Sequence, residues 1–261
     1  MDRLELIAKC LEGNLKINRR EFLEFCMIPT MVFPGIPKRA AVVKNIVAFS
    51  YDNSLTQKQL YDFAIHARRR YEKISTHLEQ EYPENIVVKI SKSYGNSYAY
   101  LRGSGFAGNI EIPTSDLKSN HDFIVHELTH IIANVSAGGS LLQEGLSVYI
   151  QDTLGEKKSY PNYGKDLHRY FYEVMSTNGQ LATSISMLRK FENFLCTGGA
   201  KEIRTSYLSA GSFVRYLIEH VLGGDIKKFM KFYYDFDFQK HFGKPFEQLE
   251  QEWLDFIKKL K

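Results

Sequence analysis

Residues 121–152 have the sequence HDFIVHELTHIIANVSAGGSLLQEGLSVYIQD, which predicts two helices joined by the turn SAGGS. In the first helix, apolar residues occur on more than one face, at Phe123, Ile124, Leu128, Ile131, Ile132 and Val135. A helix that is apolar around most of its circumference lies in a protein interior. We therefore expect the first helix to be largely buried, with the second returning antiparallel to it.

His126 and His130 stand four residues apart in the first predicted helix. Because a helix turns by about 100° per residue, both imidazoles project from the same face and can reach one ion. Glu127 points beside that face, where it can hold a metal-bound water instead of the metal. The pattern HExxH also occurs by chance in helical proteins, so this helix alone does not decide between a zinc site and an ordinary helix.

Glu144 lies in the second predicted helix. A carboxylate there completes a site of two histidines and one carboxylate with a fourth position open for water, which is the catalytic form of a zinc site. A solvent-facing glutamate is the alternative. The residues near Glu144 are largely apolar and favour the inward orientation, namely Leu141, Leu142, Leu146 and Val148.

HELTH followed by QEGLSVY resembles the gluzincin metallopeptidases, whose third ligand lies in a Glu-Gly-aliphatic-small-x-Tyr helix. The short interval between the motifs resembles the bacterial peptidase MA-like domains within that group. The resemblance covers residues 42–259 and implies a zincin-like catalytic core similar to those of thermolysin and the aminopeptidases. It implies one zinc ion per chain, with His126, His130 and Glu144 as its ligands. By the same resemblance, Glu127 is the general base.

The motif YLSAGS at residues 207–212 resembles the tyrosine-containing helix that follows the third ligand in these domains. By that resemblance, the phenol of Tyr207 stabilises the oxyanion that forms when a peptide carbonyl is attacked. The alternative is a tyrosine that only packs in the core, because the chain contains 16 tyrosines.

These residues together predict a zinc-dependent peptidase that hydrolyses peptide bonds through a metal-activated water. The stretch GFAGNIEI, residues 105–112, is expected to be an edge strand that holds an extended peptide or protein substrate. Related aminopeptidases hold a free amino terminus with a Gly-x-Met-Glu-Asn strand, and its absence here favours an endopeptidase. The alternative function is a catalytically silent zinc-binding module that recognises a peptide or protein partner.

The region before the zinc motif predicts a small α+β lobe at residues 42–116. Four stretches rich in β-branched and aromatic residues predict strands, and the turn residues between them predict a mostly antiparallel sheet: NIVAFSYD, NIVVKIS, YAYLRGS and GNIEIPT. A cap signal at Ser54 or Thr56, followed by apolar residues at helical spacing, predicts one long helix. With a mainly helical lobe at residues 117–261, the expected fold class is α+β.

Residues 1–41 are predicted to be a separate N-terminal segment. Arg19 and Arg20 precede an apolar run that extends to Ile36, a pattern that resembles a twin-arginine export signal. The run contains Glu24 and lacks a clear cleavage site, so an amphipathic N-terminal helix is the alternative. The first interpretation predicts a periplasmic or extracellular protein, and the second a cytoplasmic one.

The 261-residue chain has 34 Lys and Arg residues against 30 Asp and Glu residues, a formal net charge of +4 without long blocks of one sign. This distribution does not indicate nucleic-acid binding. The three cysteines lack the spacing of a disulfide framework or a thiolate zinc site, so histidines and carboxylates must hold any metal. No apolar run has the length of a membrane span, so we expect a soluble body. The sequence leaves the oligomeric state open.

Overall fold

The computed structural model describes residues 39–50, 52, 54–82, 84–92, 97–101, 108–118, 122–156, 158–177, 188, 191 and 198–260. These residues form two compact units. The first unit lies within Met1–Lys73 and Glu81–Ser119, and the second within Ile74–Gln80 and Asn120–Lys261.

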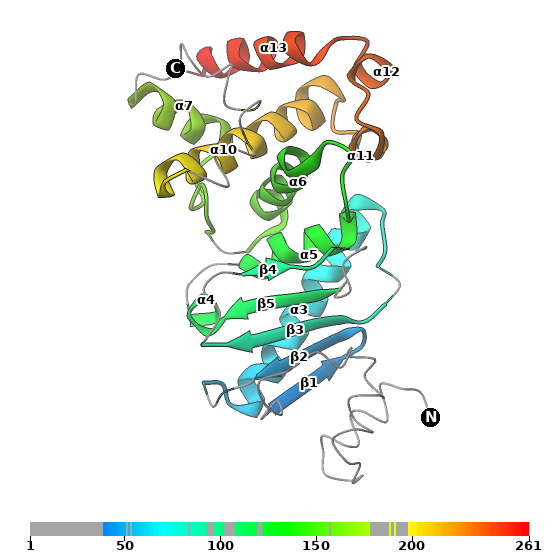
Figure 1. The fold of residues 1–261 in the computed structure, drawn as a ribbon, viewed down its shortest axis with the longest axis vertical. Helices are drawn as coiled ribbons and strands as arrows, with labels where there is room; N and C mark the ends of the chain where they lie inside the picture. The colour runs from blue at the N-terminus through cyan, green and yellow to red at the C-terminus, as the bar shows by residue number, and fades with distance from the viewer. Residues whose placement is uncertain are drawn as a thin grey trace. The chain divides into compact units, whose positions relative to one another are not determined.

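The first unit contains a five-stranded sheet with the strand order β1-β2-β3-β5-β4. The strands are β1 (Arg39–Val43), β2 (Ile46–Ser50), β3 (Ile86–Ser91), β4 (Tyr98–Ala99) and β5 (Asn109–Pro113), and the short helix α4 (Thr114–Lys118) follows (Figure 1). The central strands β2, β3 and β5 are parallel, whereas β1 and β4 pair antiparallel at the two edges. The α+β class is thus confirmed, but the sheet is mixed and not mostly antiparallel.

The parallel pairing of β2 with β3 follows from the long helix between them, α3 (Gln57–Leu78). Parallel neighbours need a crossover connection, whereas a short turn produces an antiparallel hairpin. The helix begins with a reciprocal capping box, in which the Gln59 amide donates to the Thr56 hydroxyl and the Thr56 amide donates to the Gln59 side chain. Leu60, Ala64 and Ala67 form its buried face.

Strand β5 is not the edge strand that the sequence led us to expect. It pairs with β3 on one side and with β4 on the other, where Ile110 and Glu111 face Ala99 and Tyr98. The YAY stretch forms the edge instead, because it folds back on β5. The sheet also begins at Arg39, inside the predicted N-terminal segment.

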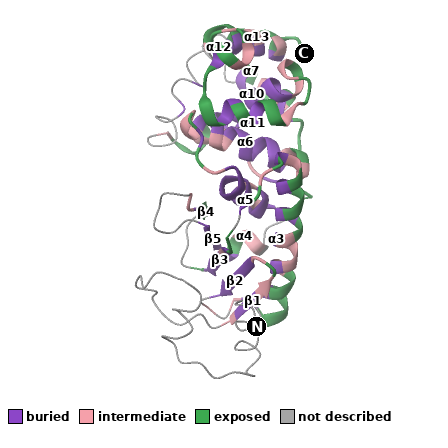
Figure 2. Cartoon of the chain, turned by 90° about the vertical axis from the view of Figure 1, so that its right-hand side faces the viewer, coloured by how far each residue is buried: buried purple, intermediate pink, exposed green. Residues whose placement is uncertain are grey.

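In the residues of the second unit that the structure describes, the regular elements are helices. These are the end of α3, α5 (Phe123–Ala133), α6 (Gly139–Leu154), α7 (Leu167–Thr177), α10 (Ala200–Tyr216), the π-helical turn η1 (Leu217–Val221), α11 (Ile226–Asp235), α12 (Phe238–Phe242) and α13 (Phe246–Lys258). Helices α5 and α6 pack against each other and are mostly buried (Figure 2). Trp253 of α13 is fully buried and stacks on Phe171 of α7, with ring centroids 5.1 Å apart. The predicted helical lobe is therefore present.

None of the helices in the described part of the chain is long and apolar enough to cross a membrane. Arg19 and Arg20 fall outside the described residues, so the export signal stays a prediction.

Candidate metal centre

Helix α5 places His126 and His130 on one face, as their four-residue spacing predicts. Their Nε2 atoms lie 3.2 Å apart, and the two rings meet edge to face with centroids 4.8 Å apart. Most of α5 is buried, because apolar residues cover the rest of its circumference. The two imidazoles therefore have little freedom to turn away from each other.

Helix α6 brings Glu144 to the same point. Its Oε2 atom lies 3.0 Å from Nε2 of His126 and 3.3 Å from Nε2 of His130. Zinc–ligand bonds of about 2.0–2.1 Å in tetrahedral geometry place the ligand atoms about 3.3 Å apart. The three atoms are thus already spaced as three corners of a zinc tetrahedron.

Glu144 is a partly buried carboxylate that lies between the two histidines. Burial alone raises the pKa of a carboxyl group, but the charge of His130 and hydrogen bonds from both imidazoles hold the pKa of Glu144 below its ordinary value. Burial likewise lowers the pKa of His130, and the opposing effect of Glu144 outweighs it, so this pKa is raised. Glu144 therefore stays ionised between the two imidazoles, where it can serve as an anionic ligand for a cation.

Ser147, one turn after Glu144 on α6, orients the second histidine. Its buried hydroxyl lies 3.3 Å from Nδ1 of His130. When Nδ1 carries the proton and donates it to this hydroxyl, Nε2 presents its lone pair towards Glu144 and His126. Hydrogen bonds of this kind fix the tautomer and ring orientation of metal-binding histidines.

Glu127 lies beside the three ligand atoms and is not one of them. Among the described residues, His126, His130 and Glu144 form a group whose ligand atoms all lie within 4.8 Å of one another, and Glu127 is not a member. Its side chain is nonetheless buried, at 7% exposure, and its charge acts on both His130 and Tyr207. This position agrees with the predicted role of a base that does not hold the metal.

Helix α10 crosses α6 at close range, and two glycines make this possible. A Cβ on Gly145 would lie 2.6 Å from Cγ2 of Val214 and 2.8 Å from the carbonyl oxygen of Ala210. A Cβ on Gly211 would lie 2.4 Å from Cγ1 of Val148. The glycine that follows Glu144 therefore serves to let α10 approach the metal ligands.

Tyr207 of α10 reaches the site through this close contact. Its ring centroid is 6.1 Å from that of His126, and its phenol lies close enough to Glu144 for this carboxylate to affect its pKa. Burial, and then the charges of Glu144 and Glu127, raise the pKa of the phenol well above its ordinary value. The side chain thus lies beside the metal ligands and keeps its proton at neutral pH.

Tyr160 is a neighbour of the site that the sequence analysis missed. Its ring centroid lies 5.6 Å from that of Tyr207, and burial raises its pKa as well. It comes from the segment between α6 and α7, which has no motif of its own. Only the folded chain reveals this contact.

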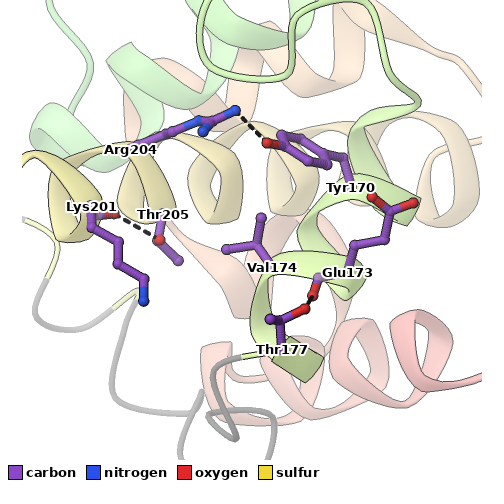
Figure 3. Close-up of a pocket in the computed structure, with 7 residues that line it drawn as sticks. All are labelled: Tyr170, Glu173, Val174, Thr177, Lys201, Arg204 and Thr205. Atoms are coloured by element: carbon purple, nitrogen blue, oxygen red, sulfur yellow. Dashed lines mark hydrogen bonds between the residues drawn. The ribbon is translucent and has the colours of Figure 1, made fainter.

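A pocket of about 290 Å³ lies between α7 and α10 (Figure 3). Its lining is mostly polar and charged: Tyr170, Glu173, Val174, Thr177, Lys201, Arg204 and Thr205. Arg204 is held by a hydrogen bond to the Tyr170 hydroxyl and another to the Pro161 carbonyl. The metal ligands do not line this pocket, so the two are separate features of the second unit.

Comparisons of the chain with protein-family models, with curated proteins and with solved structures found no match. The resemblance to the gluzincins therefore depends on the motifs HELTH and QEGLSVY and on the geometry that they adopt in the fold.

We expect the protein to bind about one zinc ion tightly, and Glu144→Ala to lose most of it. Two histidines alone make a much weaker site, because the central negative charge and one ligand are gone. Elemental analysis of the purified variant checks this, with Glu173→Ala, an exposed carboxylate of the same unit, as the control. Full zinc content in Glu144→Ala would place the third ligand elsewhere.

We also expect Gly145→Ala to destabilise the second unit. Alanine in place of glycine favours a helix by up to about 1 kcal/mol. Forcing a methyl group into a packed contact costs about 1–3 kcal/mol, so the loss should exceed the gain. Chemical denaturation measures the difference against Gln143→Ala on the same helix, and a more stable Gly145→Ala protein would contradict the close contact.

Proposed function

We propose that the protein is a zinc-dependent peptidase, and that it is an endopeptidase. The observation that supports this most strongly is the spacing of 3.0–3.3 Å between the ligand atoms of His126, His130 and Glu144. Two imidazoles and one carboxylate are a ligand set that suits zinc, although other divalent ions also accept it. Such a set leaves a coordination position open for reaction.

Zinc, when bound, supplies a Lewis acid that acidifies water and polarises a peptide carbonyl. The remaining chemistry belongs to the side chains around the ligands. Glu127 accepts a proton from the attacking water and returns it to the leaving amine. Its burial beside the ligands suits this role, because a carboxylate shielded from solvent exchanges protons with the reacting groups and not with bulk water.

Tyr207 has the properties of a donor to the developing oxyanion. Its raised pKa means that the phenol is protonated at neutral pH and so has a proton to donate. The phenol lies close enough to Glu144 and Glu127 for both carboxylates to affect its pKa, so it already stands beside the proposed reaction site. A donor that is already positioned before reaction stabilises a transition state at little cost in reorganisation.

The second candidate function is a zinc-binding module that recognises a peptide or protein without turnover. The position of Tyr207 beside Glu144 supports this alternative, because a phenol next to the carboxylate also suits a site whose only task is to hold an ion. The buried carboxylate of Glu127 supports the enzyme, since a purely structural site has no need of a base. Chelator-sensitive cleavage of a diverse peptide library separates the two functions.

Glu127→Gln distinguishes the base from the ligands. The change keeps the size of the side chain and removes its ability to accept a proton, so we expect normal zinc content, normal thermal stability and almost no hydrolysis. Zinc analysis, thermal denaturation and library digestion of the same preparation provide the three measurements. Loss of zinc in parallel with activity would mean that Glu127 is itself a ligand.

Tyr207→Phe tests the oxyanion role. Loss of one such donor costs about 10²–10³ in turnover. Because the hydrogen bond forms mainly in the transition state, kcat should fall with little change in KM or zinc content. Tyr163→Phe in the same unit, where the side chain is 41% exposed, is the control. Retained turnover together with a lower melting temperature would instead indicate a core tyrosine.

A further inference from the structure

A second group of metal-binding side chains lies at the far end of α10. His168 comes from α7, and Glu219 and His220 come from the π-helical turn η1. One ligand atom from each of the three residues lies within 4.8 Å of the others. The group has the same composition as the candidate metal centre, two imidazoles and one carboxylate, and shares no residue with it.

His168 has a buried ring nitrogen that needs a partner. The residue is 4% exposed, and its Nδ1 atom lies 2.8 Å from the Ser212 hydroxyl. Ser212 also accepts a hydrogen bond from the indole of Trp253, at 3.0 Å. Nε2 of His168 is buried as well, and no described residue forms a hydrogen bond with it. A buried polar group without a partner is destabilising, and a metal ion would provide a partner for this nitrogen.

The π-helical turn explains how Glu219 and His220 reach the same point. The amide of Leu222 donates to the carbonyl of Leu217 at 2.9 Å, which is the wider i to i+5 pattern. In an α-helix, consecutive side chains diverge by about 100°. A wider turn reduces that divergence, and single π-helical turns are frequent at functional sites.

The positively charged guanidinium of Arg215 lies near this second group, but carboxyl groups surround it and reduce its repulsion of a cation. Three carboxylates lie close to that guanidinium: Glu219 at 2.9 Å, Asp166 at 3.0 Å and Asp152 at 3.7 Å. Three carboxyl groups surround one guanidinium, so the arginine can balance the charge of only one of them. An added divalent ion would therefore meet a net negative environment.

We propose that His168, Glu219 and His220 bind a divalent transition-metal ion, most readily zinc, at a second site that is independent of the first. The ion would link α7 to the end of α10 and so stabilise the second unit. Binding should be weaker than at the first site, because atoms up to 4.8 Å apart must move to about 3.3 Å for a tetrahedral ion. His220 is exposed and can make this movement.

Aromatic packing is the competing explanation for the position of His220. Its ring stacks on Tyr216 with centroids 5.7 Å apart and lies 4.4 Å from the ring of Phe256. Packing of this kind needs no ion and would give no response to zinc. A zinc titration therefore separates the two explanations.

The test is a zinc titration of chelator-treated full-length protein against a chromophoric competitor. We expect about two ions per chain for the wild type, one tight and one weak. His220→Ala and Glu219→Gln should each retain the tight ion and lose the weak one, and Glu144→Ala should do the reverse. His66→Ala, a partly exposed histidine of the first unit, is the control and should bind both.

Thermal denaturation provides a second measurement. Zinc beyond the first equivalent should raise the melting temperature of the wild type, and this rise should be absent in His220→Ala. A wild type that binds a single ion, or a His220→Ala protein that keeps both ions and the full rise, would overturn the proposal. Because the tight ion is counted separately, failure here is distinguishable from failure of the first metal centre.

Discussion

The arrangement of the second unit depends on the close approach of α6 and α10 at Gly145 and Gly211. Neither glycine has room for a side chain, since a methyl group would overlap Val214, Ala210 or Val148. Glu144 directly precedes one of these glycines, and Tyr207 lies one turn before the other. The contact that packs the helices therefore also decides which groups surround the metal ligands. The geometry of the candidate metal centre and the packing of these helices cannot change separately in this fold.

The same packing places a charged cluster in the interior, which is costly unless its members compensate one another. Glu144 interacts with the two imidazoles at 3.0–3.3 Å, and these interactions compensate the carboxylate. The hydroxyl of Ser147 forms a hydrogen bond with the other ring nitrogen of His130, Nδ1. An arrangement of this kind adds little to the net stability of a fold, because the attraction between its members mainly offsets their desolvation. Its presence is better explained by the ion that it can bind. The partly buried phenols of Tyr207 and Tyr160 add further polar groups to this part of the unit, and burial raises the pKa of both.

The sequence was informative where chemistry follows local spacing. His126 and His130 share a face because of helical periodicity, and Thr56 caps α3 through its local partner Gln59. The position of Glu144 beside the histidines could be predicted only by assuming that the second helix returns antiparallel to the first. The apolar residues around Glu144 supported that assumption. The sheet was harder to predict, because the pairing of β2 with β3 depends on the crossover through α3 and not on the turns between strands. Ser147, Tyr160 and His168 were missed, since each meets its partner only through contacts between segments distant in sequence.

Zinc K-edge absorption spectroscopy of the protein loaded with one equivalent of zinc identifies the ligands of the ion. We expect a four-coordinate ion with two imidazole ligands and further oxygen ligands, with bonds of about 2.0–2.2 Å. A sulfur ligand at about 2.3 Å, or a spectrum without imidazole scattering, would show that zinc binds elsewhere in the chain. Either result would contradict the assignment of His126, His130 and Glu144 as the metal ligands.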